Sequence, residues 1–118
     1  FTRDLMWEKY PPAIRETLKK DGVYLEPSEY SDDPYKVSYG LIQDGESHIL
    51  LNSAIELKCP IRLFHGLKDK DVPSDTSARI ADKLLSDDVI ISYNKSGDHS
   101  LSSSADLERL RCALVELC

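Results

Sequence analysis

Long hydrophobic runs, paired cysteines and an excess of positive charge are all missing from this sequence of 118 residues. No apolar stretch approaches the roughly 20 residues that a helix needs to cross a bilayer, so no membrane span is expected. Fifteen lysine and arginine residues stand against 21 aspartate and glutamate residues. The resulting net charge of −6 has the wrong sign for binding nucleic-acid phosphates. We therefore expect neither a membrane span nor a nucleic-acid partner.

Cysteine is scarce, and its spacing shows no CxxC pair. An odd number of cysteines does not favour a disulfide framework and indicates a reducing compartment, which we take to be the cytoplasm or the mitochondrion. The three cysteines are Cys59, Cys112 and Cys118. The sequence begins at Phe1 without a methionine or an apolar leader, so we expect further sequence upstream.

Residues 1–58 are interrupted by prolines and predict only short elements. We expect a helix over residues 3–10, because Pro11 disfavours helix in the residue before it. A second helix is expected over residues 13–20, with Pro12 at its first position and Gly22 just beyond its end. Residues 34–41 fit either a helix or a strand, so the pattern leaves that segment open.

The pattern is clearer from residue 59 onward. It predicts a strand over 61–64, a helix over 74–86, a strand over 89–93, and a helix that begins after Ser103. Apolar strands alternating with amphipathic helices are typical of a parallel sheet covered on both faces. Two helical stripes are expected to face that sheet: Ala78, Ile80, Ala81, Leu84 and Leu85, then Leu107, Leu110, Leu114 and Leu117. Because two strands alone are marginal, we expect additional strands upstream.

The candidate chemistry lies in the loops that follow the two predicted strands. The carboxyl ends of neighbouring parallel strands meet at one edge of a sheet, where reactive groups gather. Asp69 follows the first strand and His99 follows the second. A carboxylate bound to Nδ1 of a histidine fixes the tautomer in which Nε2 takes a proton from a nucleophile. No GxSxG nucleophile motif is present, and Ser38 has neither the first glycine nor a buried strand before it, so we expect the nucleophile outside this chain.

Two motifs carry a resemblance to a known family. His65-Gly66-x-x-Asp69-x-x-Val72-Pro73 and Gly97-x-His99-Ser100 resemble the acid and histidine motifs of the α/β-hydrolase superfamily. The run from Cys59 to Gly66 and the pair Asp98-His99 narrow the resemblance to palmitoyl-protein thioesterases of mitochondria and related bacterial serine hydrolases.

This resemblance implies an α/β fold in which residues 59–118 are the C-terminal βαβα unit, with the last two parallel strands and their helices. Residues 1–58 would be a lid inserted before that unit. It implies that Asp69 is the triad acid and His99 the general base for a serine supplied by the rest of the hydrolase domain. The implied substrates are acyl esters or thioesters, and the 118 residues alone are expected to be inactive. The substrate-binding residues are not identified.

Other interpretations of the same residues remain open. Asp71 and Asp98 compete with Asp69 for the role of the acid. His48 is expected at the surface, whereas His65 is expected to be packed and hydrogen-bonded. Cys59 is expected to be buried. The three histidines show no metal-ligand spacing, so neither a metal nor another cofactor is expected.

Other functions also remain open. An upstream aspartate nucleophile would indicate a dehalogenase or epoxide hydrolase, and a propeller domain would indicate a serine peptidase. A non-catalytic binding domain that has lost the nucleophile is the alternative from another functional class.

Overall fold

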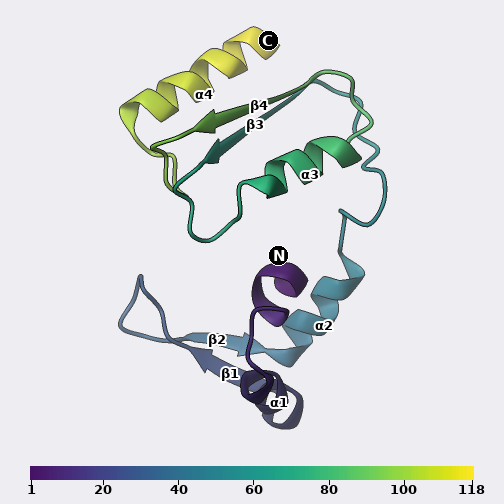
Figure 1. Ribbon diagram of the computed structural model, residues 1–118, viewed down its shortest axis with the longest axis vertical. Helices are drawn as coiled ribbons and strands as arrows, with labels where there is room; N and C mark the ends of the chain where they lie inside the picture. The colour runs from purple at the N-terminus through teal and green to yellow at the C-terminus, as the bar shows by residue number, and fades with distance from the viewer. The chain divides into compact units, whose positions relative to one another are not determined.

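The structure is a computed structural model that describes all 118 residues. The chain forms two compact units, Phe1–Ile49 and Leu50–Cys118, and Figure 1 shows the elements of each. None of the helices has the length and apolar composition needed to span a bilayer.

The first unit combines three helices with an antiparallel pair of strands. Its elements are η1 (Thr2–Trp7), α1 (Pro12–Asp21), β1 (Val23–Glu26), β2 (Tyr35–Ser38) and α2 (Tyr39–Ser47). The predicted second helix is confirmed: Pro12 occupies its first turn, and Gly22 ends it with a φ of 76°, a backbone conformation that glycine adopts without steric cost. The first helix is a wide π-type turn and ends at Trp7, earlier than expected.

The segment that the sequence left open contains both predicted conformations in succession. Tyr35–Ser38 is a strand, and α2 begins at the next residue. Ser38 caps this helix, because its hydroxyl accepts a hydrogen bond from the N–H of Leu41 at 3.1 Å. The first unit has its own apolar core, which consists of Tyr10, Leu18, Val37 and Ile42. Met6 and Trp7 pack against that core.

The second unit is the predicted strand–helix–strand–helix arrangement. Its elements are β3 (Ile61–Gly66), α3 (Asp75–Lys83), β4 (Val89–Asn94) and α4 (Ser104–Leu117). The strands β3 and β4 pair in parallel, from Ile61 opposite Val89 to Gly66 opposite Asn94. In Figure 1 the strand pair lies between α3 and α4. The α/β class expected from the sequence is therefore confirmed.

Both helices of this unit bury fewer apolar side chains than expected. Helix α3 ends at Lys83 rather than Ser86, because Leu84 turns into extended backbone and bridges to Ile55. Ala78 and Leu85 of the expected stripe are exposed.

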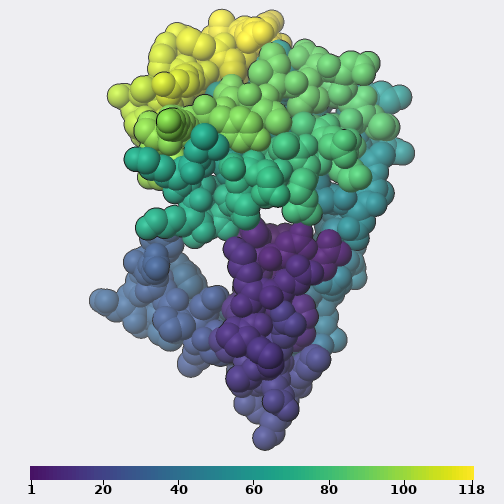
Figure 2. Space-filling view, in the orientation of Figure 1, coloured from purple at the N-terminus to yellow at the C-terminus, as the bar shows by residue number.

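The stripe expected to be buried on α4 is exposed as well, with exposed fractions of 38% at Leu117 to 55% at Leu114. A helix is about 10 Å wide, whereas two strands about 4.8 Å apart are too narrow to cover it. In the space-filling view of Figure 2, the atoms of α4 form a continuous stretch of surface at the C-terminal end of the colour scale. Cys59 is exposed too, so the prediction that it is buried is wrong. It precedes β3 in an irregular segment that no helix or strand covers.

Candidate active site

The carboxylate of Asp69 lies just beyond the end of β3 and is held from two sides. Its Oδ1 accepts the backbone N–H groups of Asp71 and Val72 at 2.8 and 2.9 Å. Its Oδ2 accepts a hydrogen bond from Nδ1 of His99 at 2.9 Å. Only 7% of the Asp69 side chain is exposed. The backbone of the loop therefore fixes one oxygen and leaves the other for the imidazole.

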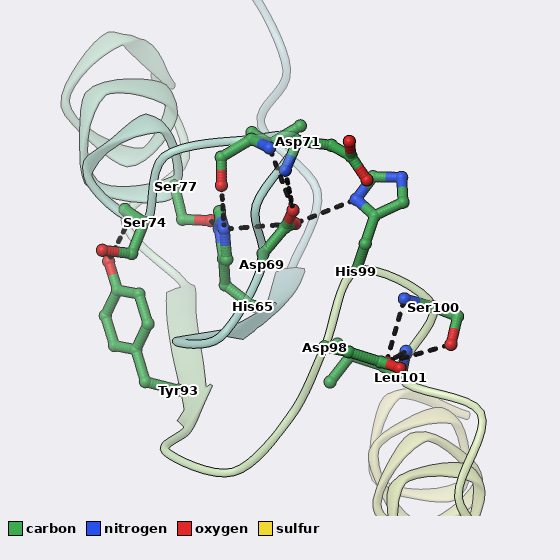
Figure 3. A network of polar contacts seen from close by, with 11 residues as sticks. His65, Asp69, Asp71, Ser74, Ser77, Tyr93, Asp98, His99, Ser100 and Leu101 are labelled. Carbon is green, nitrogen blue, oxygen red and sulfur yellow. Dashed lines mark hydrogen bonds and ion pairs between the residues drawn. The ribbon is translucent and has the colours of Figure 1, made fainter. Parts of the chain in front are cut away.

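His99 lies on the loop after β4, and its ring extends toward Asp69 (Figure 3). Its side chain is 56% exposed, in contrast to the nearly buried carboxylate. Because an ionised carboxylate only accepts hydrogen bonds, Nδ1 is the donor, and in the neutral ring Nε2 is then the unprotonated nitrogen. A partly exposed imidazole with its lone pair on Nε2 can act as a base toward a group outside this pair.

The two groups shift each other's pKa in the directions expected of an acid–base pair. The hydrogen bond to Asp69 raises the pKa of His99 above 6.5 against the opposing effect of burial, and the nearby charges of Asp71 and Asp98 add to this rise. Burial alone would raise the pKa of Asp69. The hydrogen bonds from the N–H of Val72, from His99 and from the N–H of Asp71 outweigh it and hold that pKa below its ordinary value of 3.8.

Close backbone contact sets the position of the histidine loop. A Cβ atom at Gly66 would lie closer than 3.0 Å to the carbonyl oxygens of Gly97 and Asp98, so only glycine lets the loop approach the end of β3 this closely. The N–H of Lys68 also donates to the carbonyl of Gly97 at 2.9 Å. The acid loop and the histidine loop are thus held together by backbone as well as by the side-chain pair.

The rival acids have other partners. The carboxylate of Asp98 accepts hydrogen bonds from the N–H and hydroxyl of Ser100 and from the N–H of Leu101, and so shapes the turn after His99. Asp71 contributes its backbone N–H to Asp69 and a negative charge near the imidazole. The motif spacing favoured Asp69 over these two rivals, and the hydrogen bonds bring only Asp69 onto Nδ1 of His99.

The remaining candidates lie where the sequence suggested. His48 is exposed at the end of α2 beside Asp44. His65 is buried at the end of β3, with Nδ1 2.6 Å from Oγ of Ser77 and Nε2 3.1 Å from the carbonyl oxygen of Val72. The sequence predicted a packed, hydrogen-bonded His65 but did not identify Ser77 as its partner, because the two residues are 12 positions apart and meet only through the tertiary packing of α3.

One group of side chains has the composition of a metal site. Ligand atoms of Asp69, Asp71 and His99 lie within 4.8 Å of one another. Both oxygens of Asp69 already accept N–H groups, and a cation at this point would compete with the bond from His99. The hydrogen-bond pattern is that of an acid–base pair, and we assign no metal to it.

Several known proteins are similar to this chain over nearly all of its length. No protein-family model matches the sequence. The human "Palmitoyl-protein thioesterase ABHD10, mitochondrial" is 40% identical over 112 residues, and its bovine counterpart is 38% identical over 112 residues. Each alignment covers 94% of this chain and 37% of the relative. The chain therefore spans little more than a third of the length of the curated relatives it matches.

Solved structures show the same likeness in three dimensions. A crystal structure of an inferred hydrolase from Agrobacterium vitis S4 matches with a TM-score of 0.92 and 32% sequence identity, over 99% of this chain and 45% of the other. The mouse alpha/beta hydrolase domain-containing protein 10 matches with a TM-score of 0.81 and 33% identity, over 94% of this chain and 45% of the other. The arrangement of the 118 residues is thus that of a part of these larger chains.

Proposed function

The chain is homologous to the mitochondrial palmitoyl-protein thioesterase ABHD10 and has the architecture of part of an α/β-hydrolase, and on this premise we propose that Asp69 and His99 are the acid and the base of a catalytic triad. The homology supports a hydrolase in the full-length form. The observation that carries the proposal is the hydrogen bond from Nδ1 of a half-exposed His99 to a buried carboxylate that backbone N–H groups hold in place.

The proposed reaction is acyl transfer to a serine that lies outside these 118 residues. Nε2 of His99 removes the proton from the serine hydroxyl as its oxygen attacks the acyl carbonyl, and Asp69 stabilises the imidazolium that forms. The imidazolium then protonates the leaving thiolate or alkoxide, which leaves an acyl-enzyme. A water molecule, deprotonated by the same imidazole, attacks the acyl-enzyme; the imidazolium then returns the proton to the serine oxygen as the carboxylic acid is released. We propose long-chain acyl thioesters as the substrates, since the relatives are described as palmitoyl-protein thioesterases.

We further propose that residues 1–58 are a lid over the acyl site and that residues 59–118 are the C-terminal βαβα unit of the hydrolase core. Support comes from the first unit, Phe1–Ile49, which has a core of its own apart from β3 and β4. In the full-length protein, replacing residues 1–49 by a short linker is expected to preserve turnover of short-chain esters and to abolish the preference for long chains. Equal loss of both activities would refute the lid.

A covalent probe tests the triad directly. Full-length protein treated with a fluorophosphonate is expected to gain one adduct on a serine outside residues 1–118, and His99→Ala is expected to abolish the labelling. The 118-residue chain alone is expected to remain unlabelled. Undiminished labelling of His99→Ala, or an adduct on Ser38, would refute the proposed site. An absence of any adduct in a folded full-length protein would instead favour a non-catalytic binding domain.

The compartment is proposed from the relatives, which are named as mitochondrial. Fractionation of cells that express the full-length protein tests this, and recovery with the mitochondrial fraction is the expected result.

A further inference from the structure

The imidazole of His65 is buried beneath the acid loop and fixed in one tautomer. Its Nε2 lies 3.1 Å from the carbonyl oxygen of Val72, and a carbonyl only accepts, so Nε2 carries the proton. In the neutral ring Nδ1 then accepts from the hydroxyl of Ser77, 2.6 Å away. His65 is 7% exposed and Ser77 6% exposed, so water could not readily replace these hydrogen bonds if they were broken.

These bonds connect α3 and β3 to the carboxylate that holds His99. Both backbone polar groups of Val72 are hydrogen-bonded: its N–H donates to Oδ1 of Asp69 at 2.9 Å, and its carbonyl accepts from His65. Nε2 of His65 also lies 3.7 Å from Oδ2 of Asp69, the oxygen that accepts from His99. Figure 3 shows the series of contacts from Ser77 through His65 to Asp69 and then His99.

We propose that His65 and Ser77 form a positioning pair for the triad acid: the ring of His65, oriented by the Ser77 hydroxyl, anchors the turn at Val72 and so keeps Asp69 aimed at His99. This inference rests on the proposed function. His65 does not touch the substrate in this arrangement. Its effect passes through the turn that supplies an N–H to the carboxylate.

The chain offers a matched control for this pair. Ser86 is also buried, at 9% exposure, and its hydroxyl donates to a backbone carbonyl, that of Cys59, at 2.7 Å. Ser86 precedes β4 and lies at the end of the strand pair opposite to the loops that carry Asp69 and His99. The Ser86 hydroxyl also accepts the N–H of Asp88 at 3.2 Å. Ser77→Ala and Ser86→Ala therefore each remove one buried serine hydroxyl, the first beside the acid loop and the second far from it.

The test compares the two variants in the full-length protein by kinetics and by NMR of ¹⁵N-labelled histidine. Ser77→Ala is expected to lower kcat by about 2- to 10-fold, the factor that one hydrogen bond of ordinary net strength represents, with KM unchanged. The titration midpoint of His99 is expected to fall toward 6.5 as its bond to Asp69 loosens. Ser86→Ala is expected to lower thermal stability to a similar degree without changing kcat or the His99 titration.

Two further variants separate positioning from packing. His65→Gln keeps a side-chain N–H for the carbonyl of Val72 and is expected to retain most of the activity, whereas His65→Phe fills the same space without a donor and is expected to lose it. Equal effects of these two changes, or Ser77→Ala behaving like Ser86→Ala, would overturn the proposal. If the full-length protein hydrolyses nothing, the proposed function fails, and the response of the His99 titration to Ser77→Ala still decides whether the pair positions Asp69.

Discussion

Replacing Asp69 by asparagine tests the site most sharply, because the hydrogen bonds dictate how the new side chain must sit. Oδ1 accepts two backbone N–H groups, at 2.8 and 2.9 Å, so an amide NH₂ at that position would place donors against donors. The amide oxygen must therefore occupy the Oδ1 position, and the NH₂ group must face Nδ1 of His99. Nδ1 then has to accept, the imidazole proton moves to Nε2, and the lone pair that would act as a base is lost.

The magnitude follows from that change of tautomer. The same carboxylate-to-amide change in a serine protease lowers kcat by about 10⁴. This corresponds to about 5.4 kcal/mol of transition-state stabilisation, since each tenfold change in rate is about 1.36 kcal/mol. We expect a loss of kcat of this order for Asp69→Asn in the full-length protein, with little change in KM. Replacing a charge-assisted hydrogen bond by a neutral one is expected to lower the free energy of unfolding by about 1 kcal/mol.

Asp71→Asn is the matched control, because it removes a carboxylate two residues away that does not accept the His99 bond. It is expected to lower the pKa of His99 slightly, by removing a nearby charge, and to leave kcat within a few-fold of wild type. Hydrolysis of an acyl thioester at several pH values, with circular dichroism to verify folding, measures both variants. A mild Asp69→Asn beside an inactive Asp71→Asn would show that the acid has been assigned to the wrong residue.

Three further predictions concern pH, a close contact and a helix cap. Because the hydrogen bond to Asp69 raises the pKa of His99 above 6.5, kcat/KM should fall as pH drops through that raised pKa. The contribution of His99 to the unfolding free energy should be fully present below pH 6.5 and be lost as pH rises through the raised pKa of His99. The contribution of Asp69 should be lost as pH falls from 3.8 through the lowered pKa of Asp69. Urea titrations of wild type and His99→Gln at several pH values measure the difference. Gly66→Ala should displace the histidine loop and lower both the activity and the unfolding free energy, the latter by about 1–3 kcal/mol. Gly40→Ala is the control, because position 40 of α2 is exposed and a Cβ there meets only an ordinary contact; it should raise the unfolding free energy by about 0.4–1 kcal/mol. Ser103→Ala removes the N-cap of α4 and should lower the unfolding free energy by about 1 kcal/mol in thermal denaturation.

The sequence predicted the second unit better than the first, for physical reasons. Strand β3 is a mostly apolar segment between Pro60 and Gly66, β4 begins with three consecutive apolar residues at 89–91, and the cap at Ser103 is a local signal. In the first unit, β1 has only four residues, so its length does not mark it as a strand. Its Leu25 is exposed, so apolar and buried positions do not coincide and alternation does not mark it either. The change from strand to helix at Ser38 depends on pairing with β1, which a local pattern does not contain.

The site shows the same division between local and tertiary information. Positions after successive parallel strands were enough to predict that Asp69 and His99 meet, and the structure places their atoms 2.9 Å apart. Among the three aspartates, the structure singles out Asp69 because only its carboxylate accepts the hydrogen bond from Nδ1 of His99. The exposed leucines of α4 were predicted to be buried because helical periodicity shows which residues share a face but not how wide a sheet lies beneath it.

The placement of both loops on one strand–helix–strand crossover has a consequence for folding order. Asp69 and His99 are 30 residues apart, and closing a flexible loop of that length costs about 3 kcal/mol of chain entropy by the logarithmic rule. Once β3 and β4 pair, the two side chains come together without help from any distant segment. Pairing of β3 with β4 in the complete sheet thus sets the geometry of Asp69 and His99 relative to each other, and in the proposed triad the serine is added to a pair that is already arranged.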